Sequence, residues 1–182
     1  MAEALGSRLG IPVYDNELLL QAARQSGIAP EFFMRSDENK HTFGISSIFS
    51  SNRFGNFTQS GISDSALFKI QSDVIRDLAS RGDAIFVGRV SDYVLRDRDT
   101  LDVFLTSPLE VRISRVTERL GIKPDEAAKL IRKKDRERKD YYDFFSFGDN
   151  WGRADNYDLC IDSSIRGCEG TAEFIIAFGD LL

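Results

Sequence analysis

The chain has 182 residues, a formal net charge of -5 and 42% hydrophobic residues, which is typical of a single globular domain spanning residues 1–182. It contains no run of about 18 apolar residues and no basic-then-apolar leader, so we expect neither a membrane span nor a signal peptide. Two cysteines and one histidine favour reduced thiols in a cytoplasmic protein and offer no metal-binding cluster. The acidic balance also argues against a nucleic acid polymer as a partner.

The N-terminal half predicts a short helix, a short strand, a second helix and an irregular insertion before its main helix. The first helix ends before residues 11–15, a short apolar run. Asp15 is a good N-cap for a helix that ends at Gly27. Residues 35–65 are rich in Ser, Asn, Gly and Phe without a sustained period, which indicates an insertion or flap. Residues 64–82 then show the period of an amphipathic helix.

The C-terminal half alternates short apolar runs with helical patterns. Ser91 is expected to cap one helix, and Ser107 with Glu110 to form a capping box at the next. The predicted strands are 84–88, 101–107 and 157–162, and the predicted helices are 91–97, 107–121, 123–142 and 169–182. Such alternation predicts a three-layer α/β fold, in which a parallel sheet is covered by helices on both faces.

Ligands of such folds bind beyond the carboxyl ends of the strands. We therefore expect the residues that follow the strands to gather along one rim of the sheet. These residues are Asp15, Gly88, Arg89, Thr106, Ser107, Ser163 and Ser164. Gly88 allows close backbone approach, and the guanidinium of Arg89 can grip a phosphate. Taken alone, Arg89 fits a solvated surface position equally well. Arg112 and Arg115, taken alone, fit solvated positions better than an anion site.

The basic segment from Arg132 to Lys139 contrasts with the rest of the chain. It holds six bases and two acids, a net charge of +4 within a chain of net -5. A solvated helix face is the usual fate of such a run. Here an aromatic loop follows at once and contains Trp151, the single tryptophan. Cations that meet phosphate charge, next to apolar groups that exclude water, predict a lid over a small polyanion such as a phosphate ester.

Five segments in order resemble the cytidylate kinase-like family, a branch of the P-loop nucleoside monophosphate kinases. The resemblance spans nearly the whole chain, and its specificity comes from the five segments together. They read IPVYD, QSDVIRDLASRGDAIFVGR, VFLTSPLEVRISRV, IRKKDRERKDYY and YDLCIDSS. The resemblance implies phosphoryl transfer from ATP with Mg2+ to a nucleoside monophosphate, with CMP or dCMP as the expected acceptor.

The resemblance also implies roles for individual residues. The acceptor nucleotide would be bound by Asp15, Arg76, Gly88 and Arg89. Arg112 and Arg115 would lie on the donor side. Lys134, Asp135 and Arg138 match the catalytic residues of the lid, which we place at residues 132–152. The lid cations would stabilise the transferring phosphoryl group, and Asp135 would orient the lid arginines. The resemblance implies no metal ligand from the protein.

The family begins with a strand and a glycine-rich phosphate loop. No segment of the 182 residues matches G-x-x-x-x-G-K followed by Ser or Thr. We therefore expect a sheet without its first, central strand and weak or absent kinase activity for the 182-residue chain, unless further residues precede Met1 in the native protein. Two alternatives stay open: a non-catalytic relative that binds a nucleotide or forms a homodimer through its open sheet, and a small-molecule kinase with another acceptor.

Overall fold

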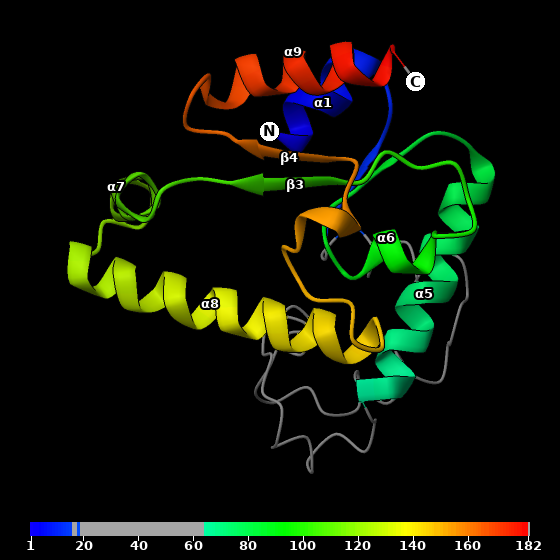
Figure 1. Cartoon of the computed structure of the whole chain (residues 1–182), viewed down its shortest axis with the longest axis horizontal. Helices are drawn as coiled ribbons and strands as arrows, with labels where there is room; N and C mark the ends of the chain where they lie inside the picture. The colour runs from blue at the N-terminus through cyan, green and yellow to red at the C-terminus, as the bar shows by residue number, and fades with distance from the viewer. Residues whose placement is uncertain (16–17, 19–63, 182) are drawn as a thin grey trace. The chain divides into compact units, whose positions relative to one another are not determined.

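The computed structural model describes residues 1–15, 18 and 64–181 (Figure 1). Contacts divide the chain into two compact units. We call Met1–Leu9 together with Asp99–Leu182 the terminal unit, and Gly10–Arg98 the middle unit. The predicted insertion lies outside the described residues except for its last two positions. The predicted helix after Asp15 is described only at Leu18, whose backbone N–H donates to the Asp15 carboxylate at 3.0 Å.

The middle unit pairs two very short parallel strands. β1 (Val13–Tyr14) lies beside β2 (Ile85–Phe86), with Val13 opposite Ile85 and Tyr14 opposite Phe86. The rings of Tyr14 and Phe86 stack at 5.6 Å between centroids. The helices α5 (Asp64–Arg81) and α6 (Ser91–Val94) complete its described elements.

The core of the middle unit forms on one face of α5. The predicted face is confirmed for Val74, Ile75 and Leu78, which are buried together with Val94 and Leu95. The sequence pattern missed Gln71 and Ser72, which are 5% and 3% exposed. The Ser72 hydroxyl donates to the carbonyl of Phe68 at 2.8 Å, so the helix satisfies this buried polar group locally.

The terminal unit contains the longer strands and the longest helix. β3 and β4 pair in parallel, from Val103 opposite Leu159 to Thr106 opposite Asp162. Within this unit, Figure 1 shows α1 and α9 on one side of this pair and α8 on the other. The elements are α1 (Ala2–Leu9), β3 (Val103–Thr106), α7 (Leu109–Leu120), α8 (Pro124–Phe145), η1 (Ala154–Asn156), β4 (Leu159–Asp162) and α9 (Gly167–Gly179).

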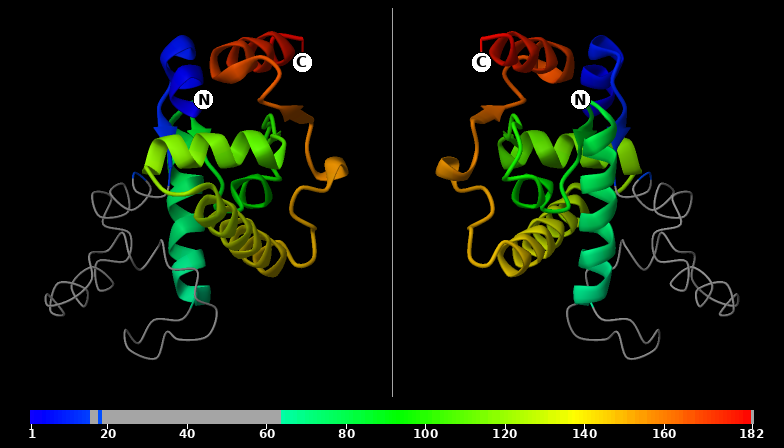
Figure 2. Two further views of the ribbon diagram at one scale, coloured as in Figure 1. Left: turned by 90° about the vertical axis from the view of Figure 1, so that its left-hand side faces the viewer. Right: turned by 90° about the vertical axis from the view of Figure 1, so that its right-hand side faces the viewer.

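Helix α1 packs against α9, and Figure 2 shows the two helices together at the top of both views. The guanidinium of Arg8 binds Glu169 at 2.9 Å and Glu173 at 3.0 Å, two carboxylates one turn apart on α9. Both acids are well exposed, so these pairs fix the register of the two helices more than they stabilise them. Gly6 of α1 is buried.

The parallel pairing predicted from the sequence is confirmed, but the described strands form two separate two-stranded sheets. The expectation of strands buried on both faces is wrong. Val87 is 45% exposed and Leu105 is 42% exposed. Each described strand has one strand neighbour, so each has one edge without a strand partner among the described residues.

Both predicted serine caps are also wrong. Helix α7 has Pro108 as its N-cap residue, and the Ser107 hydroxyl is buried without a hydrogen bond among the described residues. Proline's fixed φ suits extended as well as helical backbone, and Pro108 takes the extended ψ of 145°. In α6 the N-cap residue is Val90, and Ser91 is already helical.

The loop that returns from α8 to β4 packs its aromatic rings on β3. The Phe104 ring lies 5.4 Å from the Trp151 ring and 5.0 Å from the Tyr157 ring, between centroids. Gly152 has a φ of 74°, and a Cβ atom at this position would lie 2.9 Å from Cζ of Phe104. The glycine therefore serves both the left-handed backbone and the close approach to the ring.

Replacing Gly152 by alanine is expected to lower the free energy of unfolding by about 2–3 kcal/mol, because left-handed strain and overpacking add. Gly121→Ala is the matched control, since Gly121 has a φ of 65° and an added Cβ would meet no atom within 4 Å. We expect about 1 kcal/mol for this control. Denaturant unfolding measures both losses, and equal losses would show that the Phe104 ring yields without effect.

Candidate functional site

The apolar stripe of α8 is interrupted by charged residues in its middle. Pro124 and the acids that follow it start this helix as expected. Its buried residues are Ala127, Ile131, Tyr142 and Phe145. Lys134, Asp135 and Arg138 fall on the same face by helical spacing. A core-facing stripe that changes from apolar to charged and back is unusual for a purely structural helix, and indicates a site.

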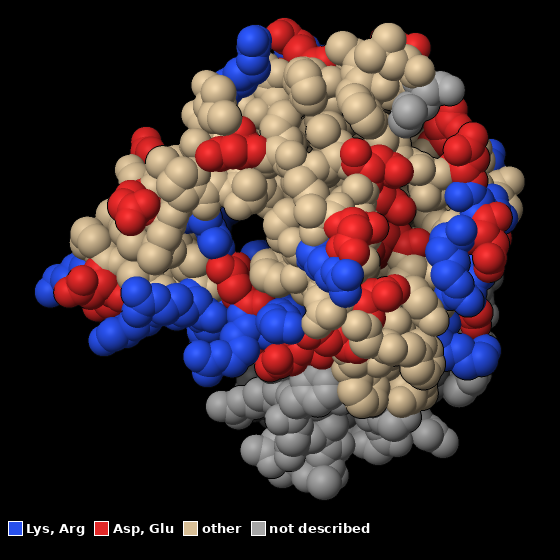
Figure 3. Space-filling view, viewed as in Figure 1, with Lys and Arg blue, Asp and Glu red and all other residues tan. Residues whose placement is uncertain are grey.

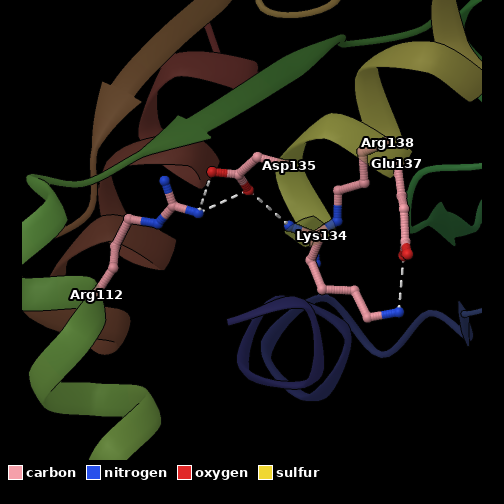
Figure 4. A network of polar contacts seen from close by, with 5 residues as sticks. All are labelled: Arg112, Lys134, Asp135, Glu137 and Arg138. Atoms are coloured by element: carbon pink, nitrogen blue, oxygen red, sulfur yellow. Dashed lines mark hydrogen bonds and ion pairs between the residues drawn. The ribbon is translucent and has the colours of Figure 1, made fainter. Parts of the chain in front are cut away.

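Asp135 lies between two arginines from different helices (Figure 4). Nη2 of Arg112 on α7 donates to both carboxylate oxygens of Asp135, at 2.7 Å each. Nη1 of Arg138 lies 3.4 Å from one of these oxygens. The side chain of Asp135 is 25% exposed and that of Arg112 is 33% exposed, so solvent screens this contact only in part. One carboxylate thus orders two guanidinium groups and leaves the trio with a positive charge.

Lys134 does not join this trio. Its ammonium binds Glu137 at 2.9 Å, and Figure 4 shows it directed away from Arg112. The Glu137 side chain is 17% exposed and also lies 4.0 Å from Lys133. Glu137 is not among the predicted site residues, although its spacing of three residues from Lys134 is a known signal for a helical ion pair.

Arg115 turns to a different partner from Arg112. Its Nη1 lies 3.3 Å from the hydroxyl of Ser163, and its Nη2 lies 3.3 Å from the carbonyl oxygen of the same residue. Ser163 directly follows β4. The pKa of the neighbouring Asp162 is lowered by hydrogen bonds from the Ser164 hydroxyl and backbone N–H, and less by the charge of Arg115, while partial burial opposes this shift. The two predicted donor-side arginines are therefore held by separate contacts, Arg112 by Asp135 of α8 and Arg115 by the residue that follows β4.

The outward face of α8 carries most of the remaining bases, which Figure 3 shows as a blue band. Lys129, Arg132, Lys133 and Arg136 are exposed there. This part of the basic segment matches the ordinary solvated helix face. The segment thus divides into an exposed basic band and a charged group around Asp135, in which Asp135 is 25% exposed and Arg138 is 62% exposed.

In the middle unit, the turn after β2 has an unusual backbone. Gly88, Arg89 and Val90 have φ values of 71°, 61° and 59°. Such values are uncommon for non-glycine residues and rare for a β-branched one. Val90 is 2% exposed, so burial of its side chain helps to hold the strained turn. Strain of this kind concentrates at ligand-binding positions.

The predicted acceptor residues all belong to the middle unit, and the predicted donor and lid residues all belong to the terminal unit. Asp15 follows β1, and Gly88 and Arg89 follow β2, so three of the four acceptor positions lie at the carboxyl ends of one strand pair. Arg76 lies on α5, 52% exposed, and its described ion pair is a local one with Asp73 at 3.8 Å. A single rim across both sheets stays a prediction.

A family model described as the cytidylate kinase-like family matches residues 1–165. The chain belongs to the cytidylate kinase-like family. The resemblance inferred from the five sequence segments is therefore confirmed.

Curated relatives of this family member match over part of their length. The chain is 34% identical over 99 residues to a cytidylate kinase of Methanopyrus kandleri, covering 49% of this chain and 50% of the relative. It is 30% identical over 107 residues to a cytidylate kinase of Pyrococcus horikoshii, covering 58% and 54%. The matching regions span about half the length of these relatives.

The fold of this family member recurs in a solved structure. The crystal structure of an uncharacterized protein from Eubacterium ventriosum matches with a TM-score of 0.72 at 23% identity. The match covers 100% of this chain and 90% of that one. At this identity the likeness shows a shared fold.

Cys160 and Cys168 are both exposed and free, in line with the expected thiols. Within residues 1–15, 18 and 64–181, no three His, Cys, Asp or Glu side chains are grouped as a metal site. Within the same residues, no helix combines the length and apolar character needed to cross a bilayer.

Asp143 fastens the end of α8 to the aromatic loop. Its carboxylate accepts the backbone N–H of Trp151 at 2.8 Å and pairs with Lys139. Burial is the largest single influence on the Asp143 carboxyl and would raise its pKa. The hydrogen bonds from Lys139 and Trp151 and the charge of Lys139 together outweigh burial and lower the pKa below its ordinary value.

Because the pKa of Asp143 is lowered in the folded state, its ionised carboxylate stabilises the fold above the unfolded pKa, roughly 3.9. This stabilisation is lost as the pH falls through the folded pKa. We therefore expect the fluorescence of Trp151 to change in this acidic range. Asp143→Asn keeps an acceptor oxygen but does not titrate, so its fluorescence should lack that component. An identical acid titration in both proteins would contradict this role of Asp143.

Proposed function

We propose that this chain takes part in phosphoryl transfer from MgATP to a nucleoside monophosphate, with CMP or dCMP as the acceptor. The observation that carries the proposal is the Asp135 carboxylate between Arg112 and Arg138. Phosphoryl transfer depends mostly on positioning and on neutralising charge, because the protein does little covalent chemistry. Two guanidinium groups ordered in advance by one carboxylate suit that task, since they need little reorganisation when charge develops.

The proposed roles follow the two units. In the middle unit, Arg76 and Arg89 bind the acceptor phosphate, and Asp15 and Gly88 face the acceptor nucleotide. In the terminal unit, the donor phosphates meet Arg112 and Arg115, and the lid contributes Lys134 and Arg138 with Asp135 as the orienting acid. Magnesium enters with ATP as part of the substrate. Lys134 is proposed to leave Glu137 for phosphate when the donor binds.

The donor phosphates also need backbone N–H groups, which P-loop kinases supply from a glycine-rich loop. The 182 residues contain no G-x-x-x-x-G-K segment followed by Ser or Thr. We therefore propose that the 182-residue chain binds the acceptor, positions the lid and binds MgATP through its arginines, more weakly than a kinase with that loop, and that its turnover is low.

A thermal unfolding panel with CMP, dCMP, UMP, AMP and GMP tests the acceptor assignment. CMP or dCMP is expected to raise the unfolding temperature most, since a ligand at about 100 times its Kd stabilises by about 2.7 kcal/mol. CMP-dependent formation of ADP from MgATP then measures transfer. A protein that responds to none of these nucleotides would contradict the proposal and favour an interaction module.

A further inference from the structure

Ser163 links the end of β4 to the end of β3, and both its backbone and its side chain form hydrogen bonds. It is 7% exposed. Its backbone N–H donates to the carbonyl of Thr106 at 3.0 Å, and its hydroxyl donates to the same carbonyl at 3.1 Å. The hydroxyl oxygen in turn accepts from Nη1 of Arg115 at 3.3 Å. The hydroxyl of Ser163 is therefore used both as a donor and as an acceptor.

The guanidinium of Arg115 donates two hydrogen bonds to Ser163. Nη1 meets the hydroxyl and Nη2 meets the carbonyl oxygen of Ser163, each at 3.3 Å. Two such contacts restrict the plane of a guanidinium group, whose remaining N–H groups stay available to a ligand. Arg115 itself is exposed. The result is a cation that is fixed in orientation and still accessible.

The groups that bind Arg115 differ in charge from the group that binds Arg112. A carboxylate, Asp135, neutralises much of the charge of Arg112. The two oxygens of Ser163 that hold Arg115 are neutral. Asp162 acts on Arg115 through space, but its carboxylate accepts hydrogen bonds from Ser164. Neutral oxygens leave the positive charge of an arginine free to attract an anion, whereas a carboxylate partner would weaken that attraction.

A purely structural reading of Ser163 is a turn residue that satisfies the strand ends. That reading explains the two bonds to Thr106, but it does not require the hydroxyl and carbonyl to face one guanidinium. We propose that Ser163 is a positioning residue, which orients the guanidinium of Arg115 toward the triphosphate of the donor nucleotide. This inference rests on the proposed function, because the donor is assigned there.

The test compares MgATP and CMP affinities of the 182-residue protein and its variants by titration. Ser163→Ala is expected to weaken MgATP binding about tenfold, within the range of coupled neighbours, and to leave CMP affinity unchanged. Ser163→Thr restores the hydroxyl and should recover most of the MgATP affinity. In the Arg115→Ala background, Ser163→Ala should weaken MgATP binding no further, because the group that it positions is gone.

Thr171→Val is the control for loss of a buried hydroxyl in the same unit, outside the lid. Thr171 is 0% exposed, and its hydroxyl donates to the carbonyl oxygen of Gly167 at 2.6 Å. An equal loss of MgATP affinity in this control would overturn the inference, as would unchanged affinity in Ser163→Ala. If the unmodified protein binds CMP but not MgATP, the donor role of Arg115 fails and the inference with it. If it binds neither nucleotide, the proposed function itself fails.

Discussion

Asp135→Asn is expected to lower CMP-dependent phosphoryl transfer about a hundredfold, the scale of losing one oriented charge-stabilising group. Asparagine keeps the shape of the side chain but removes the charge that orders Arg112 and Arg138. The two guanidinium groups would then repel one another without a carboxylate between them. The contact is partly screened, so we expect a loss of only about 1–2 kcal/mol in the free energy of unfolding. Coupled ADP formation and denaturant unfolding measure the two effects.

Asp77→Asn provides the matched control, because it removes another aspartate–arginine pair, that between Asp77 and Arg81 on α5. This pair is exposed and is expected to contribute about 0–1 kcal/mol, with no effect on transfer. Arg112→Ala and the double variant complete a cycle with Asp135→Asn. If the losses in transfer simply add, the two residues act independently, and the orienting role of Asp135 is wrong.

The second large effect is expected at Arg89, where function and stability should change in opposite directions. Arg89→Gly removes the left-handed strain at a φ of 61°, and Arg89→Ala keeps it. Both variants lose the guanidinium, so the difference in their free energies of unfolding measures the effect of the backbone strain. We expect the glycine variant to be more stable than the alanine variant by about 1 kcal/mol. We expect CMP affinity to fall about 10- to 100-fold in both, the scale of charge-assisted hydrogen bonds.

Phe147 offers a comparison for the backbone effect in the other unit. It also has a left-handed φ, of 57°, and its side chain is 86% exposed. The stability difference between Phe147→Gly and Phe147→Ala should be similar to that at Arg89. Unchanged CMP affinity in Arg89→Ala would remove this arginine from the acceptor site, whatever the stability data show.

Elements with a strong period could be predicted from the sequence, and local details could not. The apolar period of α5 and the proline and acids at the start of α8 each predict their helix within a few residues. Helix α8 continues to Phe145, three residues beyond the prediction, because Tyr142 and Phe145 extend its buried stripe. The serine caps failed because the cap depends on the ψ angle of the neighbouring residue, which composition does not determine.

The site was predictable as a set of residue types, but its pairings were not. Helical spacing places Lys134, Asp135 and Arg138 on one face of α8. It cannot show that Asp135 meets Arg112, which lies 23 residues earlier on another helix. The contact of Arg115 with Ser163 spans 48 residues. Such pairs depend on how helices and strand ends pack, and a single sequence carries no direct signal for that packing.

The pairing of α1 with α9 constrains the order in which the protein can fold during translation. The Arg8–Glu169 contact joins residues 161 positions apart, so on the ribosome α1 waits on the order of ten seconds for its partner at usual elongation rates. The core helices α5 and α6 emerge well before that. A nascent chain stalled before Gly167 would thus carry the middle unit's core residues in full, while α1 would lack its partner helix α9 and be available to chaperones.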